Sequence, residues 1–218
     1  MMERLAKATK LAPEGAKLSF AILLAGIVAL GFGFLAAGGI IVAFGLAVAS
    51  FFRDPERFPA RTDGVVISGA DGRVTDISES RIPGEESARY HRVSVFMSPL
   101  NVHVNRASVG GEVIIVEHTP GEFRAAYHDH SSQHNERNLI VMRDDAGKRH
   151  GMMQVAGYLA RRIVCRVRAH DRIEPGQRIG LIMFGSRVDH FVPPEYRITV
   201  TIGERVRAGE TVIGEIQE

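Results

Sequence analysis

Hydrophobic positions divide this chain into two parts with different patterns. Residues 18–52 contain no charged side chain, whereas the sequence after them alternates short apolar runs with glycine and charge. An uncharged stretch of this length exceeds the roughly 20 residues that one membrane-spanning helix needs. The segment Ala36-Ala37-Gly38-Gly39 offers a turn near its middle. The pattern predicts a helical hairpin with arms of about 17 residues, which either spans a membrane or re-enters it from one side.

Basic residues surround the uncharged stretch. Residues 1–17 alternate basic and apolar positions, which is typical of an amphipathic helix on a lipid surface or of a disordered leader. The flanking cations are Lys7, Lys10, Lys17, Arg53, Arg57 and Arg61. The positive-inside rule then puts both ends of the hairpin, and the rest of the chain, on the cytoplasmic side of the cell membrane. A charged, proline-broken exit at 51–59 marks a boundary, so we expect a membrane-anchoring segment at 1–57 and a second domain at 58–218.

The second domain carries many short β-branched runs. They lie at 65–67, 74–77, 93–97, 112–117, 138–143, 163–167, 178–183, 198–202 and 211–216. Short strands at this spacing are typical of a mainly β barrel or sandwich. A turn-and-strand pattern occurs twice, at 174–182 and 207–216, as in barrel-sandwich domains. We therefore predict a mainly β (α+β), barrel-sandwich-like domain with one helix, at 152–161.

Charge and cysteine content narrow the classes of function. The 218 residues carry a formal net charge of +2 with a pI near 8.9, which is too mild to indicate nucleic-acid binding. The cations cluster beside the apolar stretch, which indicates contact with an anionic membrane lipid. The single cysteine, Cys165, excludes an internal disulfide framework.

The Gly185-Ser186 bond is the first candidate for chemistry. An apolar run at 181–184 stops at this bond, and the sequence restarts with the charged residues Arg187 and Asp189. Glycine has no Cβ to crowd its carbonyl carbon, so a strained turn lets the Ser186 hydroxyl fold back onto the Gly185 carbonyl. That geometry permits self-cleavage through an N-to-O acyl shift. A tight turn between two strands is the alternative interpretation.

Three further patterns carry polar side chains at strand ends. Asp71 lies in a glycine-flanked turn, His103 follows an apolar strand and a proline, and Asn135-Glu136-Arg137 heads another strand. Taken singly, Asp71 reads as a turn residue and His103 as a hydrogen-bonded structural histidine.

Three histidines have the spacing of metal ligands. His128, His130 and His134 form a His-x-His-x3-His pattern. Their surroundings at 121–138 are polar, which favours a solvated or substrate-covering loop. We therefore expect no metal there.

Together these motifs resemble the phosphatidylserine decarboxylase family, in the short branch that also includes the archaetidylserine enzymes. The resemblance covers the hydrophobic N-terminus and five ordered motifs. These are Phe-Phe-Arg-Asp-Pro-Glu-Arg at 51–57, Ala70-Asp71-Gly72, Ser98-Pro99 with His103, Asn135-Glu136-Arg137 and Phe184-Gly185-Ser186. The resemblance implies a phosphatidylserine decarboxylase, a carboxy-lyase of phospholipid biosynthesis that is made as a zymogen.

The resemblance also implies a self-made pyruvoyl cofactor. Ser186 would attack the Gly185 carbonyl, with His103 as the base and Asp71 orienting it. The precursor would split into a β chain, residues 1–185, and an α chain, residues 186–218, that begins with a pyruvoyl group in place of Ser186. This group would form a Schiff base with phosphatidylserine and accept electrons while CO2 leaves, which gives phosphatidylethanolamine.

Two departures from the family pattern affect the expected roles. Longer members carry Leu-Gly-Ser-Thr at the cleavage site, where this chain has Phe184-Gly185-Ser186-Arg187. They also carry a second histidine at the position where this chain has Arg106. His103 is then the candidate both for self-processing and for protonating the decarboxylated product. Arg106 and Arg187 are candidates for holding the serine carboxylate or the phosphodiester, because a forked guanidinium suits both. The expected partners are the two chains of one precursor, the lipid substrate and a second processed unit in a homodimer.

Three alternatives stay open at this point. A non-enzymatic, membrane-anchored barrel-sandwich adaptor would use Gly185-Ser186 as an ordinary turn. A pyruvoyl decarboxylase for a soluble amino acid would have no need of the uncharged stretch at 18–52. An archaetidylserine decarboxylase would act on the same phosphoserine head on a different lipid backbone.

Overall fold

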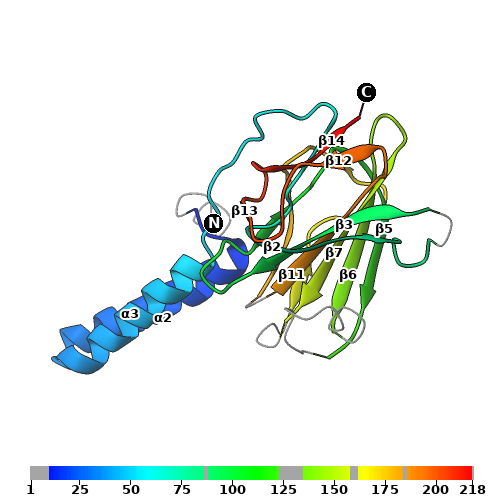
Figure 1. Cartoon of the computed structure of the whole chain (residues 1–218). Helices are drawn as coiled ribbons and strands as arrows, with labels where there is room; N and C mark the ends of the chain where they lie inside the picture. Colours follow the sequence, from blue (N-terminus) through cyan, green and yellow to red (C-terminus); the bar gives the residue numbers. More distant parts are fainter. Residues whose placement is uncertain (1–9, 86–87, 123–134, 158–161, 184–185, 218) are drawn as a thin grey trace. The chain divides into compact units, whose positions relative to one another are not determined.

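A computed structural model of the chain describes residues 10–85, 88–122, 135–157, 162–183 and 186–217. The chain folds into two compact units, of which one ends at Glu56 and the other begins at Arg57. Figure 1 shows the first as a pair of helices and the second as a group of curled sheets.

The first unit is the predicted helical hairpin, formed by α2 (Pro13–Gly31) and α3 (Leu35–Phe51). The position predicted for its turn is wrong. The chain reverses around Gly33, whose φ of +86° suits a residue without a Cβ, and Ala36 to Gly39 belong to α3. A Cβ on Gly38 would lie 2.9 Å from the backbone nitrogen of Leu30, so this glycine serves close helix packing rather than a turn.

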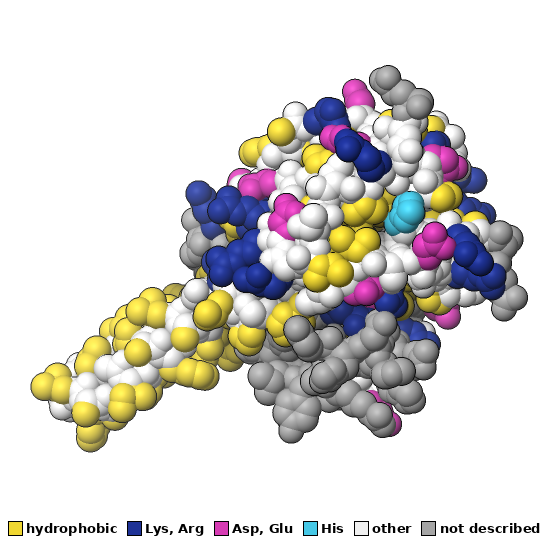
Figure 2. All heavy atoms as spheres, in the orientation of Figure 1, with side chains coloured by type: hydrophobic (Ala, Val, Ile, Leu, Met, Phe, Trp, Pro, Cys, Tyr) yellow, Lys and Arg dark blue, Asp and Glu magenta, His cyan; other side chains and the backbone are white. Residues whose placement is uncertain are grey.

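The outer surface of the helical unit is apolar. Large side chains on both helices are exposed, among them Phe20 at 57%, Ile27 at 60% and Ile40 at 71%. Figure 2 shows hydrophobic side chains along the whole length of this unit. By length and composition α2 is able to cross a membrane, and α3 is a shorter apolar helix. An apolar surface of this extent favours association with a membrane.

The described residues of the second unit form antiparallel strands in three sheets. An eight-stranded sheet has the order β13-β2-β3-β11-β7-β6-β5-β9, and two three-stranded sheets have the orders β1-β14-β12 and β4-β10-β8. The strands are β1 (Val65–Ile67), β2 (Gly72–Ser80), β3 (Tyr90–Met97), β4 (Val104–Arg106), β5 (Gly111–Thr119), β6 (Arg137–Arg143), β7 (Arg149–Ala156), β8 (Ile163–Cys165), β9 (Arg172–Ile173), β10 (Arg178–Ile182), β11 (Ser186–Val192), β12 (Tyr196–Ile198), β13 (Arg205–Val206) and β14 (Val212–Ile216). The prediction of a mainly β domain is confirmed.

Both faces of the eight-stranded sheet are covered. One face carries the main core, in which β7 contributes Met152. The other face carries a second cluster that includes Met153 and Val155. Because both faces are buried, β7 does not show the simple alternation of a half-exposed strand. The helix predicted at 152–161 is therefore wrong for its first half, which is strand, and residues 158–161 lie outside the described part of the chain.

The two turn-and-strand repeats come together in the fold. Gly176 and Gly209 stand at equivalent places in the repeats, with φ of +77° and +76°. A Cβ on Gly176 would lie 3.8 Å from the Cα atom of Gly209. The repeated sequence pattern thus reflects two similar glycine turns that lie side by side.

Candidate active site

Ser186 is the first residue of β11, in the middle of the large sheet. It stands opposite Met97 of β3 and Ala156 of β7, and its exposed fraction is 0%. Its hydroxyl donates to Sδ of Met97 at 3.4 Å. A thioether is a weak acceptor, so within the described part of the chain the hydroxyl makes only a weak hydrogen bond. Gly185, the other half of the candidate cleavage bond, lies outside the described residues.

His103 lies in the connection between β3 and β4, which is closed by Asn101. The Asn101 side chain accepts hydrogen bonds from the backbone and hydroxyl of Ser98 at 2.9 and 2.7 Å. Nδ1 of His103 contacts the carbonyl oxygen of Asn101 at 2.9 Å. A carbonyl oxygen only accepts, so Nδ1 carries a proton, which leaves Nε2 as the ring nitrogen that can exchange one. His103 is 2% exposed, and the contact orients its ring.

The connection that holds His103 lies beside both strands that flank the candidate bond. Its first end is Met97, opposite Ser186. At its other end, the carbonyl oxygen of His103 accepts a hydrogen bond from the backbone of Ile182 at 3.3 Å. Ile182 ends β10, the strand before the bond, and Ser186 begins β11 after it. The fold thus brings the predicted base and the predicted nucleophile to the same region, although they are far apart in the sequence.

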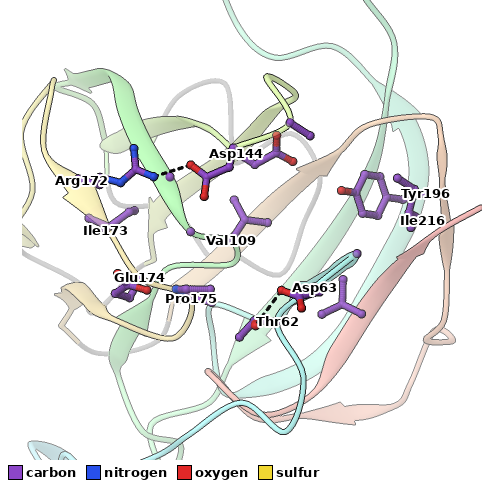
Figure 3. Close-up of a pocket in the computed structure, with 16 residues that line it drawn as sticks. Thr62, Asp63, Val109, Asp144, Arg172, Ile173, Glu174, Pro175, Tyr196 and Ile216 are labelled. Carbon is purple, nitrogen blue, oxygen red and sulfur yellow. Dashed lines mark hydrogen bonds and ion pairs between the residues drawn. The ribbon is translucent and has the colours of Figure 1, made fainter.

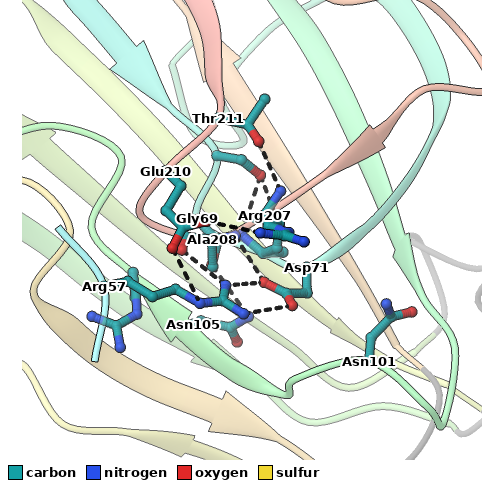
Figure 4. A network of polar contacts seen from close by, with 12 residues as sticks. Arg57, Gly69, Asp71, Asn101, Asn105, Arg207, Ala208, Glu210 and Thr211 are labelled. Carbon is teal, nitrogen blue, oxygen red and sulfur yellow. Dashed lines mark hydrogen bonds and ion pairs between the residues drawn. The ribbon is translucent and has the colours of Figure 1, made fainter. Parts of the chain in front are cut away.

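Asp71 has different neighbours (Figure 4). Arg57 donates to both of its carboxylate oxygens, and the Ala208 backbone donates to Oδ1 at 2.8 Å. Asp71 and Arg57 are both largely buried, with side-chain exposures of 10% and 9%. The contact joins two of the sequence motifs, because Arg57 ends the segment at 51–57. The proposed role of Asp71 in orienting His103 stays a prediction.

His190 and Gly69 support the turn that carries Asp71. The sequence pattern included Gly69 as a glycine of that turn, but it did not indicate His190. Nε2 of His190 accepts a hydrogen bond from the Gly69 backbone at 2.8 Å, and Nδ1 contacts the Val93 carbonyl at 3.2 Å. Burial lowers the pKa of His190 to about 4, although the bond to Val93 opposes this shift. His190 is therefore neutral at physiological pH. A Cβ on Gly69 would lie 2.5 Å from the Arg106 carbonyl oxygen, which explains the glycine.

The two arginines predicted to bind substrate are both buried. Arg187 forms a two-point ion pair with Asp189, at 2.8 and 3.0 Å. Because side chains alternate along a strand, the Arg187 side chain projects from the face of β11 opposite to that of Ser186. Arg106 is 3% exposed and donates to the Gly176 carbonyl at 2.9 Å. Roles of these arginines in substrate binding stay predictions.

The Asn135-Glu136-Arg137 motif leads into β6. Asn135 is fully buried, and its side-chain amide donates to the carbonyl oxygen of Ala156 at 2.7 Å. Ala156 is one of the two residues opposite Ser186. The motif therefore supports the backbone beside the candidate nucleophile.

The candidate metal ligands His128, His130 and His134 lie outside the described residues. Within the described ranges, no group of three His, Cys, Asp or Glu side chains is arranged to hold a metal.

A pocket of about 450 Å³ lies away from these residues (Figure 3). Asp63, Asp144 and Glu174 are among its lining residues, and its Arg172 is paired with Asp145 at 2.6 Å. Its acidic lining disfavours an anionic phosphodiester. We therefore place the candidate active site at Ser186 and not in this pocket.

Comparison with known proteins identifies the class of this site. The sequence model of the family described as phosphatidylserine decarboxylase matches residues 44–214. A phosphatidylserine decarboxylase proenzyme of Symbiobacterium thermophilum is 44% identical over 183 residues, which cover 84% of this chain and 85% of that protein. Proteins of the same description from Chlorobium luteolum and Desulfotalea psychrophila are 47% and 43% identical, over 75% and 76% of this chain and 76% and 78% of their own lengths.

These similar proteins are enzymes that are named as precursors. The chain belongs to the phosphatidylserine decarboxylase family. The resemblance drawn from the five motifs is thereby confirmed, and so is the prediction of a decarboxylase against that of a non-enzymatic adaptor.

Proposed function

We propose that this chain is a membrane-associated phosphatidylserine decarboxylase that makes its own pyruvoyl group by cleavage between Gly185 and Ser186. The observation that supports this most directly is the position of His103 beside the strands on both sides of that bond. Membership of a family whose relatives are named proenzymes supports the self-processing step.

In the proposed processing step, the Ser186 hydroxyl is the nucleophile. Its oxygen forms a bond to the Gly185 carbonyl carbon while the peptide C–N bond breaks, and the hydroxyl proton ends on the released amine. His103 takes up the proton in between, at Nε2, while Nδ1 stays bonded to the Asn101 carbonyl. Elimination of the ester then yields chains of residues 1–185 and 186–218, and hydrolysis with loss of ammonia leaves the pyruvoyl group.

The surroundings of Ser186 fit a buried carbonyl group. The residue is closed off from water, and its hydroxyl rests on a sulfur rather than on a strong acceptor. The pyruvoyl carbonyl supplies an electron sink for decarboxylation of an amine-bearing substrate. His103 is the group that we propose returns a proton to the product. Arg106 and Arg187 are proposed as contacts for the anionic head, although the Arg187 side chain projects from the other face of β11.

Phosphatidylserine is the substrate that we propose. The similar proteins carry that lipid in their names, which favours a phosphatidyl over an archaetidyl backbone. A lipid substrate also explains why an apolar hairpin is part of the chain, which a decarboxylase of free amino acids would not need.

We propose that residues 1–57 anchor the protein and that residues 58–218 form the decarboxylase domain. The basic residues on both sides of the hairpin support a location of that domain at the cytoplasmic face, in contact with anionic lipid. A homodimer of processed units is also proposed. Cross-linking in detergent, with mass measured before and after, tests the dimer.

Salt is expected to leave the protein on membranes. Insertion of an uncharged hairpin does not depend on ionic attraction, whereas a contact made only by arginines weakens once the screening length falls to about 3 Å at 1 M salt. The measurement is sedimentation of membranes washed at 1 M NaCl, with a chain that starts at Arg57, the first residue of the second unit, as the control. Release of the full chain by salt alone would contradict the hairpin anchor.

Reductive trapping tests the proposed carbonyl group. A carbonyl condenses with an amine, and borohydride makes the link permanent, so incubation with phosphatidylserine and borohydride should inactivate the enzyme. The mass of the lipid should appear on the fragment 186–218 and not on the fragment 1–185. Chelation of metals should leave the activity intact. Lipid mass on a lysine of the larger fragment would show that a different group carries the chemistry.

A further inference from the structure

Three buried amide side chains form a hydrogen-bonded row through the β domain. Nδ2 of Asn138 donates to Oε1 of Gln154 at 2.9 Å, and Nε2 of Gln154 donates to Oδ1 of Asn105 at 2.9 Å. Their exposed fractions are 1%, 0% and 0%. Asn138 and Gln154 face each other across β6 and β7, while Asn105 lies on β4 of a different sheet. The row therefore links two sheets, and its hydrogen bonds offset the cost of burying amides.

The row has a direction that its last member fixes. Nδ2 of Asn105 lies 3.5 Å from the carbonyl oxygen of Gly69 and 3.7 Å from Sδ of Met97. A carbonyl oxygen only accepts, so the Asn105 group that faces it must be the NH2 group. Oδ1 of Asn105 then faces Gln154, which must donate, and Gln154 in turn accepts from Asn138. The row consequently ends in an N–H donor.

This donor end is linked to Ser186 through one shared neighbour, Met97. The Met97 sulfur that Asn105 contacts is the atom to which the Ser186 hydroxyl donates, at 3.4 Å. Both contacts of Asn105 Nδ2 are long, so its donor capacity is only weakly used before cleavage. The row also passes beside β10, because a Cβ on Gly180 would lie 3.3 Å from Nε2 of Gln154. Gly180 stands opposite Asn105 in the strand ladder.

We propose that Asn105 donates a hydrogen bond to the Ser186 oxygen during self-processing, and that Gln154 is the residue that positions it. As the Ser186 hydroxyl gives up its proton, negative charge develops on its oxygen, and a fixed N–H donor stabilises that charge. The Oγ–C bond forms and the peptide C–N bond breaks as described above, so the row adds no reactant. This inference rests on the proposed function of Ser186.

The first test removes the donor and keeps the volume. Full-length chain is made by cell-free translation with liposomes of phosphatidylglycerol and phosphatidylcholine, and its splitting is followed on denaturing gels. Asn105→Leu should split at least about 10-fold more slowly than the natural chain, because a hydrogen bond to a charged oxygen is lost. Val141→Ala is the matched control. It removes packing from the second core cluster, so it should lower the unfolding temperature and leave the splitting rate unchanged.

The second test makes the row sensitive to pH. In Gln154→Glu a protonated carboxyl group donates to Asn105 and accepts from Asn138 as the amide does, whereas a carboxylate has no proton to donate. The splitting rate of Gln154→Glu, divided by that of the natural chain at the same pH, should therefore fall as pH rises. Gln154→Met has no hydrogen-bonding group of this kind and should split slowly at every pH. Unfolding temperatures measured at each pH show whether the variants are folded where they split slowly.

The outcomes separate this inference from the proposed function. If the natural chain splits but Asn105→Leu splits equally fast, the inference is wrong and self-processing stands. If Asn105→Leu does not fold, the pH series with Gln154→Glu tests the inference instead. A splitting rate of Gln154→Glu, relative to the natural chain, that does not change with pH then overturns the inference. If the natural chain does not split, or if Ser186→Ala splits, the proposed function itself fails.

Discussion

Replacement of Ser186 by alanine is expected to leave one uncut chain near 23.9 kDa with no decarboxylase activity. The substitution removes the attacking oxygen and, with it, the source of the pyruvoyl carbonyl. The loss of activity should be roughly 10⁴-fold or more, as when the nucleophile of a serine enzyme is removed. Intact mass of the purified chain and release of CO2 from labelled phosphatidylserine are the measurements.

Ser94→Ala is the matched control for this experiment. Ser94 lies on β3, the strand next to Ser186, and is 1% exposed. Its register partner on β11 is Asp189 rather than Ser186, so the variant should split and turn over normally. If the Ser186→Ala variant still yields a fragment that begins at residue 186, the proposed mechanism is disproved.

Replacement of His103 by alanine is expected to slow splitting by on the order of 10²-fold or more, because the proton of the Ser186 hydroxyl loses its acceptor. The time course of splitting after translation measures this. His91→Ala is the control, since His91 lies at the end of β3 far from Met97, opposite Val192 of β11. Normal processing in His103→Ala would assign the role of base to another residue.

Asp71→Asn distinguishes two ways in which that carboxylate can act. If Asp71 orients His103, the variant should slow splitting at an unchanged unfolding temperature. In the structure Asp71 neutralises Arg57, and loss of one partner of a buried ion pair costs about 3 kcal/mol or more. We therefore expect Asp71→Asn to lower the unfolding temperature and to slow splitting less than His103→Ala does.

The sequence predicts the helical hairpin and most of the strands because both patterns are local. An uncharged stretch and β-branched runs between glycines depend only on neighbouring residues. The wrong predictions concern residues whose conformation is determined by tertiary contacts. Gly38 reads as a turn residue, yet it packs against Leu30, and the strand around Met152 reads as helix because both of its faces are buried. β11 is a central strand in which polar residues such as Asp189 are buried, so its sequence does not show the apolar pattern expected of such a strand.

In the candidate site, too, residues with a local sequence pattern are predicted and residues placed by tertiary contacts are not. Ser186, His103 and Asp71 stand out because small or polar residues follow apolar runs, and the resemblance to a family connects them. Asn105, Gln154 and His190 give no such signal, since each lies within a strand that pairs with a distant segment. Their hydrogen bonds join residues 49 and 121 positions apart, which no local pattern shows. The pairing of Arg187 with Asp189, by contrast, joins residues only two positions apart on one face of a strand.

The central place of β11 bears on the product of the proposed cleavage. The fragment 186–218 would begin with β11, which pairs with β3 and β7, and its β14 would pair with β1 of the fragment 1–185. Strand pairing would therefore hold the two proposed fragments together. The precursor folds as a single molecule, whereas separated fragments would first have to meet, so their refolding would depend on concentration. We therefore expect the proposed cleavage to make loss of the fold harder to reverse in dilute solution.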